Sequence, residues 1–224
     1  MTSNALVDLS VEVSTSTFGP PSTNVPVKVE RFHRGPGFWQ VSSVHASVHT
    51  GTHIDTPLHC FADGKTTSDA SMQDLSGHVA YFGLDKQRSQ PVTAEDLEAA
   101  NPGLGPGEVA VLATGWTDAM WGKFPDYYVS SPYLHESAAR WLVERRPTAV
   151  VFDFFEEECA RRKHFTSEEF VVHRILLGAG IYLVEQATAL SQLRGKNAMI
   201  YAAFFRIADC DGAPARLFAL VENR

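Results

Sequence analysis

The chain has 224 residues, of which 44% are hydrophobic and 20% charged, a composition typical of one large folded domain. The formal net charge is −7 and the basic residues form no stripe, so we expect no nucleic-acid partner. No apolar run is long enough to span a bilayer, so we expect no membrane partner either.

The cysteines and the first residues bear on the cellular compartment. Cys60, Cys159 and Cys210 are scattered and odd in number, which indicates reduced thiols rather than a disulfide framework. Met1 to Ala5 contain no basic region followed by an apolar core, so we expect no secretion signal. The protein is therefore predicted to be cytoplasmic.

The chain begins with a predicted strand and a loop. Residues 5–13 alternate apolar and polar side chains, which predicts a strand. Residues 14–24 are rich in Ser, Thr, Pro and Gly, which predicts a loop. Phe18 lies in this loop. It either packs on the domain surface, as single exposed aromatics often do, or forms a wall of a substrate pocket.

A hairpin is predicted next. Residues 25–32 and 38–48 both alternate, and Arg34-Gly35-Pro36-Gly37 between them has the composition of a turn. Pro26 favours an edge strand or a strand that begins just after it. The second strand leads the chain directly into the most distinctive segment.

That segment, HTGTHIDTPLH, carries three histidines and a carboxylate within eleven residues. Imidazole nitrogen and carboxylate oxygen are the usual donors for zinc or manganese. The Thr-Gly-Thr between His49 and His53 opposes a helix, so we predict an extended chain with a turn at Gly51. Alternate side chains of an extended chain share a face, which places His53 beside Asp55. The spacing predicts a metal site, because packing alone explains these polar residues poorly.

The rest of the chain alternates predicted strands and helices. Strands are predicted at residues 79–84, 108–114, 148–154, 181–184, 197–207 and 216–221. Helices are predicted after Thr93, at 135–146 and after the capping box that begins at Thr166. The strand–helix–strand order of residues 108–154 predicts a right-handed parallel crossover.

Several polar and aromatic residues keep more than one interpretation. Asp153, at the end of a predicted strand, is either a cap or a support for a site residue. The loop at 116–133 either packs or lines a site. Residues 156–163 hold acids followed by bases, typical of a solvated helical face. His173 and Glu185 each have a simple packing explanation, and spacing alone does not pair them with the first histidines.

The motif H-x-G-T-H-x-D-x-P-x-H at residues 49–59 resembles the signature of the metal-dependent cyclase family, which includes bacterial kynurenine formamidases and isatin hydrolases. Residues 173–185 resemble its second motif, in which a His is followed twelve positions later by a Glu. Residues 8–10 and 112–116 are also similar to the family, so the resemblance covers essentially the whole chain.

The resemblance implies an α/β fold of the swivelling β/β/α, cyclase-like type, with a mixed, partly closed sheet. It implies a single domain over residues 1–224 that forms a homodimer or homotetramer. The implied activity is metal-dependent hydrolysis of a C–N bond in a small-molecule substrate, either an arylformamide such as N-formylkynurenine or a cyclic amide such as isatin. A cyclase, dehydratase or lactone hydrolase using the same site remains an alternative, as does a non-catalytic protein that binds a metal or small molecule.

The resemblance also implies roles for individual residues. The implied metal ligands, for one or two ions, are His49, His53, Asp55, His173 and Glu185. Asp55 and Glu185 would be shared or bridging, and His59 would be the general acid/base rather than a ligand. The mixture of nitrogen and oxygen donors suits zinc, with manganese as the second choice. An imidazole, with an ordinary pKa of about 6.5, can exchange a proton near neutral pH.

Two departures from the family bear on the substrate. Formamidases of the family carry Trp-Pro-Gly in the first loop, where this chain has Phe18-Gly19-Pro20. Cys60 replaces a Phe that commonly follows the last histidine of the first motif. A nucleophilic Cys60 is disfavoured, because neighbours in an extended chain point to opposite faces.

Overall fold

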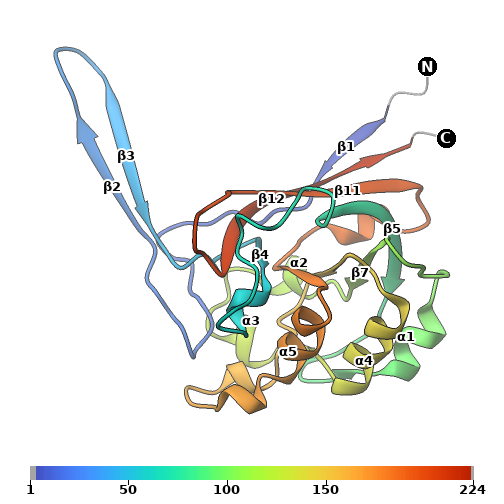
Figure 1. Cartoon of the computed structure of the whole chain (residues 1–224). Helices are drawn as coiled ribbons and strands as arrows, with labels where there is room; N and C mark the ends of the chain where they lie inside the picture. Colours follow the sequence, from blue (N-terminus) through green and yellow to red (C-terminus); the bar gives the residue numbers. More distant parts are fainter. Residues whose placement is uncertain (1–3, 223–224) are drawn as a thin grey trace.

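The computed structural model describes residues 4–222 (Figure 1). The strands run over β1 (Ala5–Asp8), β2 (Lys28–His33), β3 (Gln40–His45), β4 (His53–Asp55), β5 (Ser76–Gly83), β6 (Pro91–Val92), β7 (Val109–Ala113), β8 (Tyr133–Leu134), β9 (Ala149–Phe152), β10 (Tyr182–Glu185), β11 (Ala198–Phe204) and β12 (Gly212–Val221). The helices run over α1 (Ala94–Ala100), α2 (Trp116–Met120), α3 (Asp126–Val129), α4 (Glu136–Arg145) and α5 (Val171–Gly178). Short 3₁₀ turns cover Pro57–His59, Cys159–Arg161, Ser167–Glu169 and Leu190–Leu193.

The main sheet closes on itself. Its order is β1-β12-β11-β5-β7-β9-β10-β4, and β12 also pairs with β4, so the strands from β12 to β4 form a seven-stranded ring with β1 outside it. Strands β5, β7, β9 and β10 are parallel neighbours, whereas β4, β11 and β12 pair in antiparallel fashion. The predicted α/β fold with a mixed, partly closed sheet is confirmed, and so is the parallel crossover from β7 to β9.

Both faces of the ring are buried. Val109 and Val111 belong to a cluster that draws residues from β4, β9, β10, β11 and β12 and therefore fills the ring. Ala110 and Leu112 belong to a second cluster, with residues of α1, α4 and α5, on the outer face. These helices lie together on one side of the sheet (Figure 1). Because β7 is covered on both faces, all of its residues are apolar and buried.

The β2–β3 hairpin projects away from the body of the protein (Figure 1). It pairs in antiparallel register from Lys28 opposite His45 to His33 opposite Gln40. Every residue of the two strands is exposed. The predicted hairpin is confirmed, with strands shorter than the alternating pattern.

Local caps explain where two helical segments begin. The predicted cap of α1 is confirmed: the Thr93 side chain and Asp96 form a reciprocal capping box. The box of Thr166 and Glu169 instead closes only a 3₁₀ turn, and α5 begins at Val171.

Two segments differ from their predictions. The first strand ends at Asp8, and the Val11 N–H donates to Thr52 Oγ1 at 3.0 Å rather than to a neighbouring strand. The predicted solvated helical face at residues 156–163 is wrong at its start, because Glu156 and Glu157 are buried.

Within residues 4–222, no helix is long and apolar enough to cross a membrane. The prediction about a secretion signal concerns the first five residues, of which 1–3 lie outside the described range.

Candidate metal centre

A turn, a short strand and a 3₁₀ turn position the first motif. Gly51 adopts a φ of +69°, and a Cβ there would overlap the side chain of Val13, so the turn requires glycine. The chain then enters β4, which carries His53 and Asp55. The 3₁₀ turn that begins at Pro57 carries His59. The predicted bend at Gly51 is confirmed.

The pleat of β4 determines which face carries the polar side chains. Ile54 points into the ring, so His53 and Asp55 lie on the outer face, where α5 packs. In the antiparallel pairing of β4 with β10, Glu185 lies opposite His53. The register of the sheet therefore places Glu185 beside the first motif, far from it in sequence.

One group of donors comes from the first motif alone. His49 Nδ1 lies 2.7 Å from Asp55 Oδ1, and His53 Nε2 lies 3.3 Å from the same oxygen. These three side chains each offer a ligand atom, and the atoms lie within 4.8 Å of one another. The structure thus brings together the three residues predicted for one ion.

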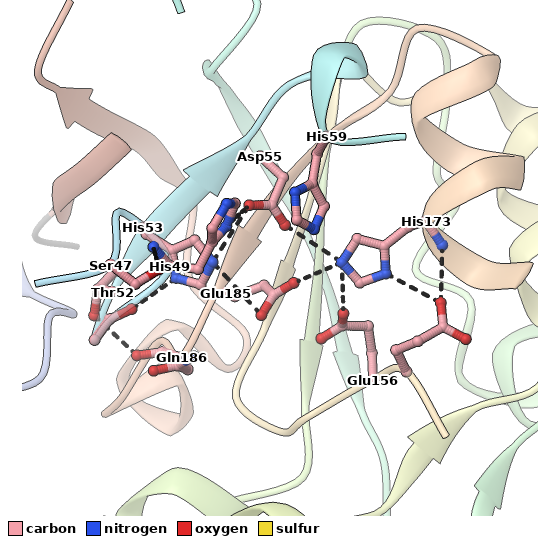
Figure 2. Close-up of polar contacts among 12 residues, drawn as sticks. Ser47, His49, Thr52, His53, Asp55, His59, Glu156, His173, Glu185 and Gln186 are labelled. Carbon is pink, nitrogen blue, oxygen red and sulfur yellow. Dashed lines mark hydrogen bonds and ion pairs between the residues drawn. The ribbon is translucent and has the colours of Figure 1, made fainter. Parts of the chain in front are cut away.

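A second group joins the first motif to the second (Figure 2). His173, on α5, has its Nε2 atom 3.1 Å from Glu185 Oε1 and 3.4 Å from Asp55 Oδ2. Asp55 therefore belongs to both groups, whereas Glu185 belongs to the second group alone. All five predicted ligands meet at one place on the outer face of the ring.

Hydrogen bonds fix the orientation of two of the histidines. His53 Nδ1 lies 2.8 Å from the Gly51 carbonyl oxygen, which can only accept, so Nδ1 carries the proton. His173 Nδ1 lies 3.0 Å from Glu157 Oε2, which also accepts the backbone N–H groups of Val172 and His173. In the neutral rings, each Nε2 lone pair then faces carboxylate oxygens. Such partners behind the ring are typical of metal-binding histidines.

The donor set fits a divalent cation. Among the described residues, Asp55 Oδ2 is buried without a hydrogen-bond partner. Burial opposes charge on Asp55, but His53 and His49 outweigh it and hold the pKa of the carboxyl well below its ordinary range. Burial also opposes charge on His173, but Asp55, Glu157 and Glu185 raise the pKa of its ring well above the ordinary value. The Nε2 lone pairs and the carboxylate oxygens that they face repel each other, and a cation bound between them would relieve this repulsion.

Asp211 links two histidines at the edge of this centre. Its Oδ2 atom lies 2.9 Å from His49 Nε2 and 2.9 Å from His59 Nδ1. Hydrogen bonds from both rings, which outweigh partial burial, hold the pKa of the Asp211 carboxyl far below its ordinary value. Burial favours neutral His49, but Asp55 and Asp211 outweigh it and raise the pKa of His49 to about 10. Asp211 is a residue that the sequence analysis missed.

The centre opens into a cavity of about 720 Å³. Residues Pro20 and 22–25 of the first loop line it, together with Phe155, Phe165 and Phe170. Phe18 is not among the lining residues. Its ring stacks on Phe124, with centroids 6.0 Å apart. The aromatic wall therefore comes from the segment that follows β9.

The structure answers two questions that the sequence left open. Asp153 accepts hydrogen bonds from Thr114 N, Thr114 Oγ1 and Gly115 N, each at 2.7 Å, so it caps the turn after β7. The loop at 116–133 mainly packs: the Trp116 indole donates to the Tyr127 carbonyl at 2.9 Å, and Tyr127 and Tyr128 are fully buried.

Cys60 lines the cavity as a half-buried thiol. Burial raises its pKa to about 11. This pKa disfavours the thiolate that a cysteine nucleophile requires.

Comparison with known proteins identifies the family. The sequence model of the Cyclase family, described as "Putative cyclase", matches residues 7–158. The chain belongs to this family. The predicted family membership is thereby confirmed.

Known relatives resemble the chain over most of its length. A kynurenine formamidase of Bacillus cereus is 27% identical over 180 residues, which cover 80% of this chain and 79% of the relative. A solved structure of an isatin hydrolase bound to the product analogue thioisatinate shares the fold, with a TM-score of 0.85 at 22% identity, covering 98% of this chain and 93% of the other. A potential metal-dependent hydrolase with cyclase activity has a TM-score of 0.72 at 21% identity, covering 99% and 100%.

Proposed function

We propose that this protein is a metal-dependent hydrolase that cleaves a C–N bond in a small amide, either an arylformamide or a cyclic amide. The observation that carries the proposal is the convergence of three histidines, His49, His53 and His173, on the carboxylates of Asp55 and Glu185 in the lining of a cavity. The names of the relatives, a kynurenine formamidase and an isatin hydrolase, support the two substrate classes.

The cation would be held by the two groups of donors. His49, His53 and Asp55 would hold one ion, and Asp55, His173 and Glu185 a second. The nitrogen and oxygen donors suit zinc, with manganese as the second choice. A bound divalent cation would supply Lewis acidity, which acidifies water and polarises a carbonyl group.

His59 would move the proton. The ionised Asp211 carboxylate accepts from Nδ1 of His59 and so keeps the proton on that atom. The other ring nitrogen, Nε2, is then the atom that takes a proton from water and returns it to the leaving nitrogen. Asp211 thus orients a ring that exchanges its proton on the opposite side.

The cavity would hold an aromatic amide. Phe155, Phe165 and Phe170 offer apolar surface beside the centre, and Arg174 lines the same cavity. Phe170 itself stacks on the His173 ring, with centroids 4.0 Å apart. An aryl group on this wall would place its carbonyl toward the histidines, and the apolar contact would exclude water from that side of the substrate.

We also propose that the chain is a single domain and that two copies pair through the β2–β3 hairpin. A two-stranded hairpin alone is marginally stable, yet this one exposes large apolar side chains on both strands and its turn: Val29, Phe32, Phe38, Trp39, Val41 and Val44. Residues 28–45 carry a net charge of +2, so the rest of the chain carries −9. The body of a second copy therefore complements the hairpin in charge.

The test is a hydrolysis screen on protein of known metal content. We expect chelator-stripped protein to be inactive and to regain hydrolysis of N-formylkynurenine or isatin when zinc or manganese is restored. Lactones belong in the same screen, because they separate amide hydrolysis from lactone opening. Full activity of the stripped protein, or tight metal binding without turnover of any substrate, would contradict the proposal.

A further inference from the structure

Glu156 is a buried carboxylate that lies beside the second group of donors (Figure 2). It follows β9, and β9 is the parallel neighbour of β10, which ends at Glu185. Because parallel strands end at the same edge of a sheet, the topology brings Glu156 next to Glu185. Its backbone is held as well, since the Leu134 N–H donates to the Glu156 carbonyl at 2.9 Å.

Both carboxylate oxygens of Glu156 lack a hydrogen-bond partner within residues 4–222, and the residue is 0% exposed. An ionised carboxylate in this state is costly, because burial removes water and no hydrogen bond replaces it. The side chain therefore needs either a proton or a cation.

The geometry around His173 favours a cation. Its Nε2 atom lies 3.4 Å from Glu156 Oε1, 3.1 Å from Glu185 Oε1 and 3.4 Å from Asp55 Oδ2. One nitrogen offers at most one proton and cannot satisfy three carboxylates. In the neutral ring that could bind a cation, the proton lies on Nδ1, which donates to Glu157, so Nε2 presents a lone pair. Ligand atoms that share one zinc ion at about 2.0–2.2 Å lie roughly 3 to 3.5 Å apart, the same range as these contacts.

We propose that Glu156 is a fourth protein ligand of the second cation, together with Asp55, His173 and Glu185; this inference rests on the proposed metal-dependent function. The carboxylate completes a set of one imidazole and three carboxylates. A donor set of this kind favours manganese more than a set rich in imidazole does.

The experiment counts and titrates metal ions, not activity. Stripped wild-type protein, Glu156→Gln and Glu156→Ala are titrated with Mn²⁺ by calorimetry, and bound metal is counted by elemental analysis. We expect two ions per wild-type chain. Both variants should keep one ion with unchanged affinity and bind the second weaker by about tenfold or more.

Glu158→Gln is the matched control, because Glu158 is exposed and two residues away. It should titrate as the wild type does. The melting temperature gives a second readout. Because Glu156→Gln removes a buried carboxylate, the stripped variant should have a Tm no lower than that of the stripped wild type. Its increase in Tm on adding Mn²⁺ should be smaller than that of the wild type. This readout also shows that the variant is folded.

Two results would overturn the inference. In the first, Glu156→Gln binds two ions with wild-type affinity, which is the result expected if Glu156 is protonated and does not coordinate the cation. In the second, the wild-type protein binds only one ion. Neither result touches the proposed hydrolysis, which is measured separately with substrate. Conversely, the wild-type protein could show no hydrolysis while Glu156→Gln still loses the second ion. That result would contradict the proposed function and support the assignment of Glu156 as a ligand.

Discussion

Asp211 Oδ2 lies 2.9 Å from Nδ1 of His59, so a carboxylate from the segment before β12 orients the His59 ring. His59 is the one histidine of the first motif that is not a proposed metal ligand. The same oxygen contacts His49. A single carboxylate thereby connects the proposed proton carrier to the proposed metal centre.

This contact predicts the effect of changing Asp211. Asp211→Ala should lower kcat by about 10–100-fold, because the His59 ring loses the partner that fixes its orientation and tautomer. Asp211→Asn should recover part of the loss, since its amide oxygen still accepts from Nδ1. Steady-state kinetics on metal-loaded protein measures both. The exposed Asp209, changed to Asn, is the control, and equal activity of Asp211→Ala and wild type would remove the positioning role.

Changing His59 should separate proton transfer from metal binding. His59→Ala should retain its full metal content and lose about two to four orders of magnitude in turnover, the usual contribution of a general acid/base. Asp55→Ala should instead lose metal, because Asp55 belongs to both donor groups. Elemental analysis with a turnover assay decides, and the exposed His78→Ala is the control. Normal turnover in His59→Ala would exclude His59 from the reaction.

The reactivity of Cys60 should depend on pH in a defined direction. Burial raises the pKa of the thiol from 9.0 to about 11, so the thiolate is a very small fraction at pH 7 and grows about tenfold per pH unit up to the pKa. Iodoacetamide should therefore label Cys60 slowly at pH 7, and faster as the pH rises. Mass spectrometry gives the rate. Activity should survive iodoacetamide at pH 7 but not a chelator; rapid labelling with parallel inactivation would support a cysteine nucleophile.

Asp153 should matter for stability and not for metal. Asp153→Asn replaces one acceptor oxygen with a donor that faces a backbone N–H, so the free energy of unfolding should fall by about 1.5–3 kcal/mol. Metal content should stay at the wild-type level. Denaturant unfolding measures the change, with the exposed Asp63→Asn as a control expected within about 0.5 kcal/mol. Loss of metal at unchanged stability would contradict the capping role.

The hairpin should determine the oligomeric state. Phe38 is 85% exposed and Trp39 56% exposed at its tip. The double variant Phe38→Ser and Trp39→Ser should convert dimers to monomers in analytical ultracentrifugation, because it removes apolar surface that a partner would bury. Met72→Ser, an exposed apolar residue outside the hairpin, should stay dimeric. A monomeric wild-type protein would refute the hairpin interface.

Local geometry made the first half of the site predictable. The bend at Gly51 and the alternation of His53 and Asp55 follow from backbone preferences within a few residues. His173 and Glu185 were predicted only through resemblance to a family, because their proximity depends on α5 packing and on the pairing of β10 with β4.

Non-local contacts explain what the sequence did not reveal. Glu156 and Glu157 sit in a run of acids followed by bases, which is also the pattern of a solvated helix surface. The parallel pairing of β9 with β10 is what brings these acidic residues to the proposed metal centre. Asp211 lies just before β12, and its relation to His59 depends on the pairing of β12 with β4, which closes the ring.

The three-residue strand β4 is bonded on both sides, to β10 and to β12. Its backbone is therefore held by the scaffold, and the positions of His53 and Asp55 do not depend on the loops that surround the substrate. Mutations in residues 14–24, or at Phe155 and Phe165, can reshape the cavity while His53 and Asp55 stay in place. Substitutions in the residues that line the cavity can therefore change which amide binds, without any change to the residues on β4.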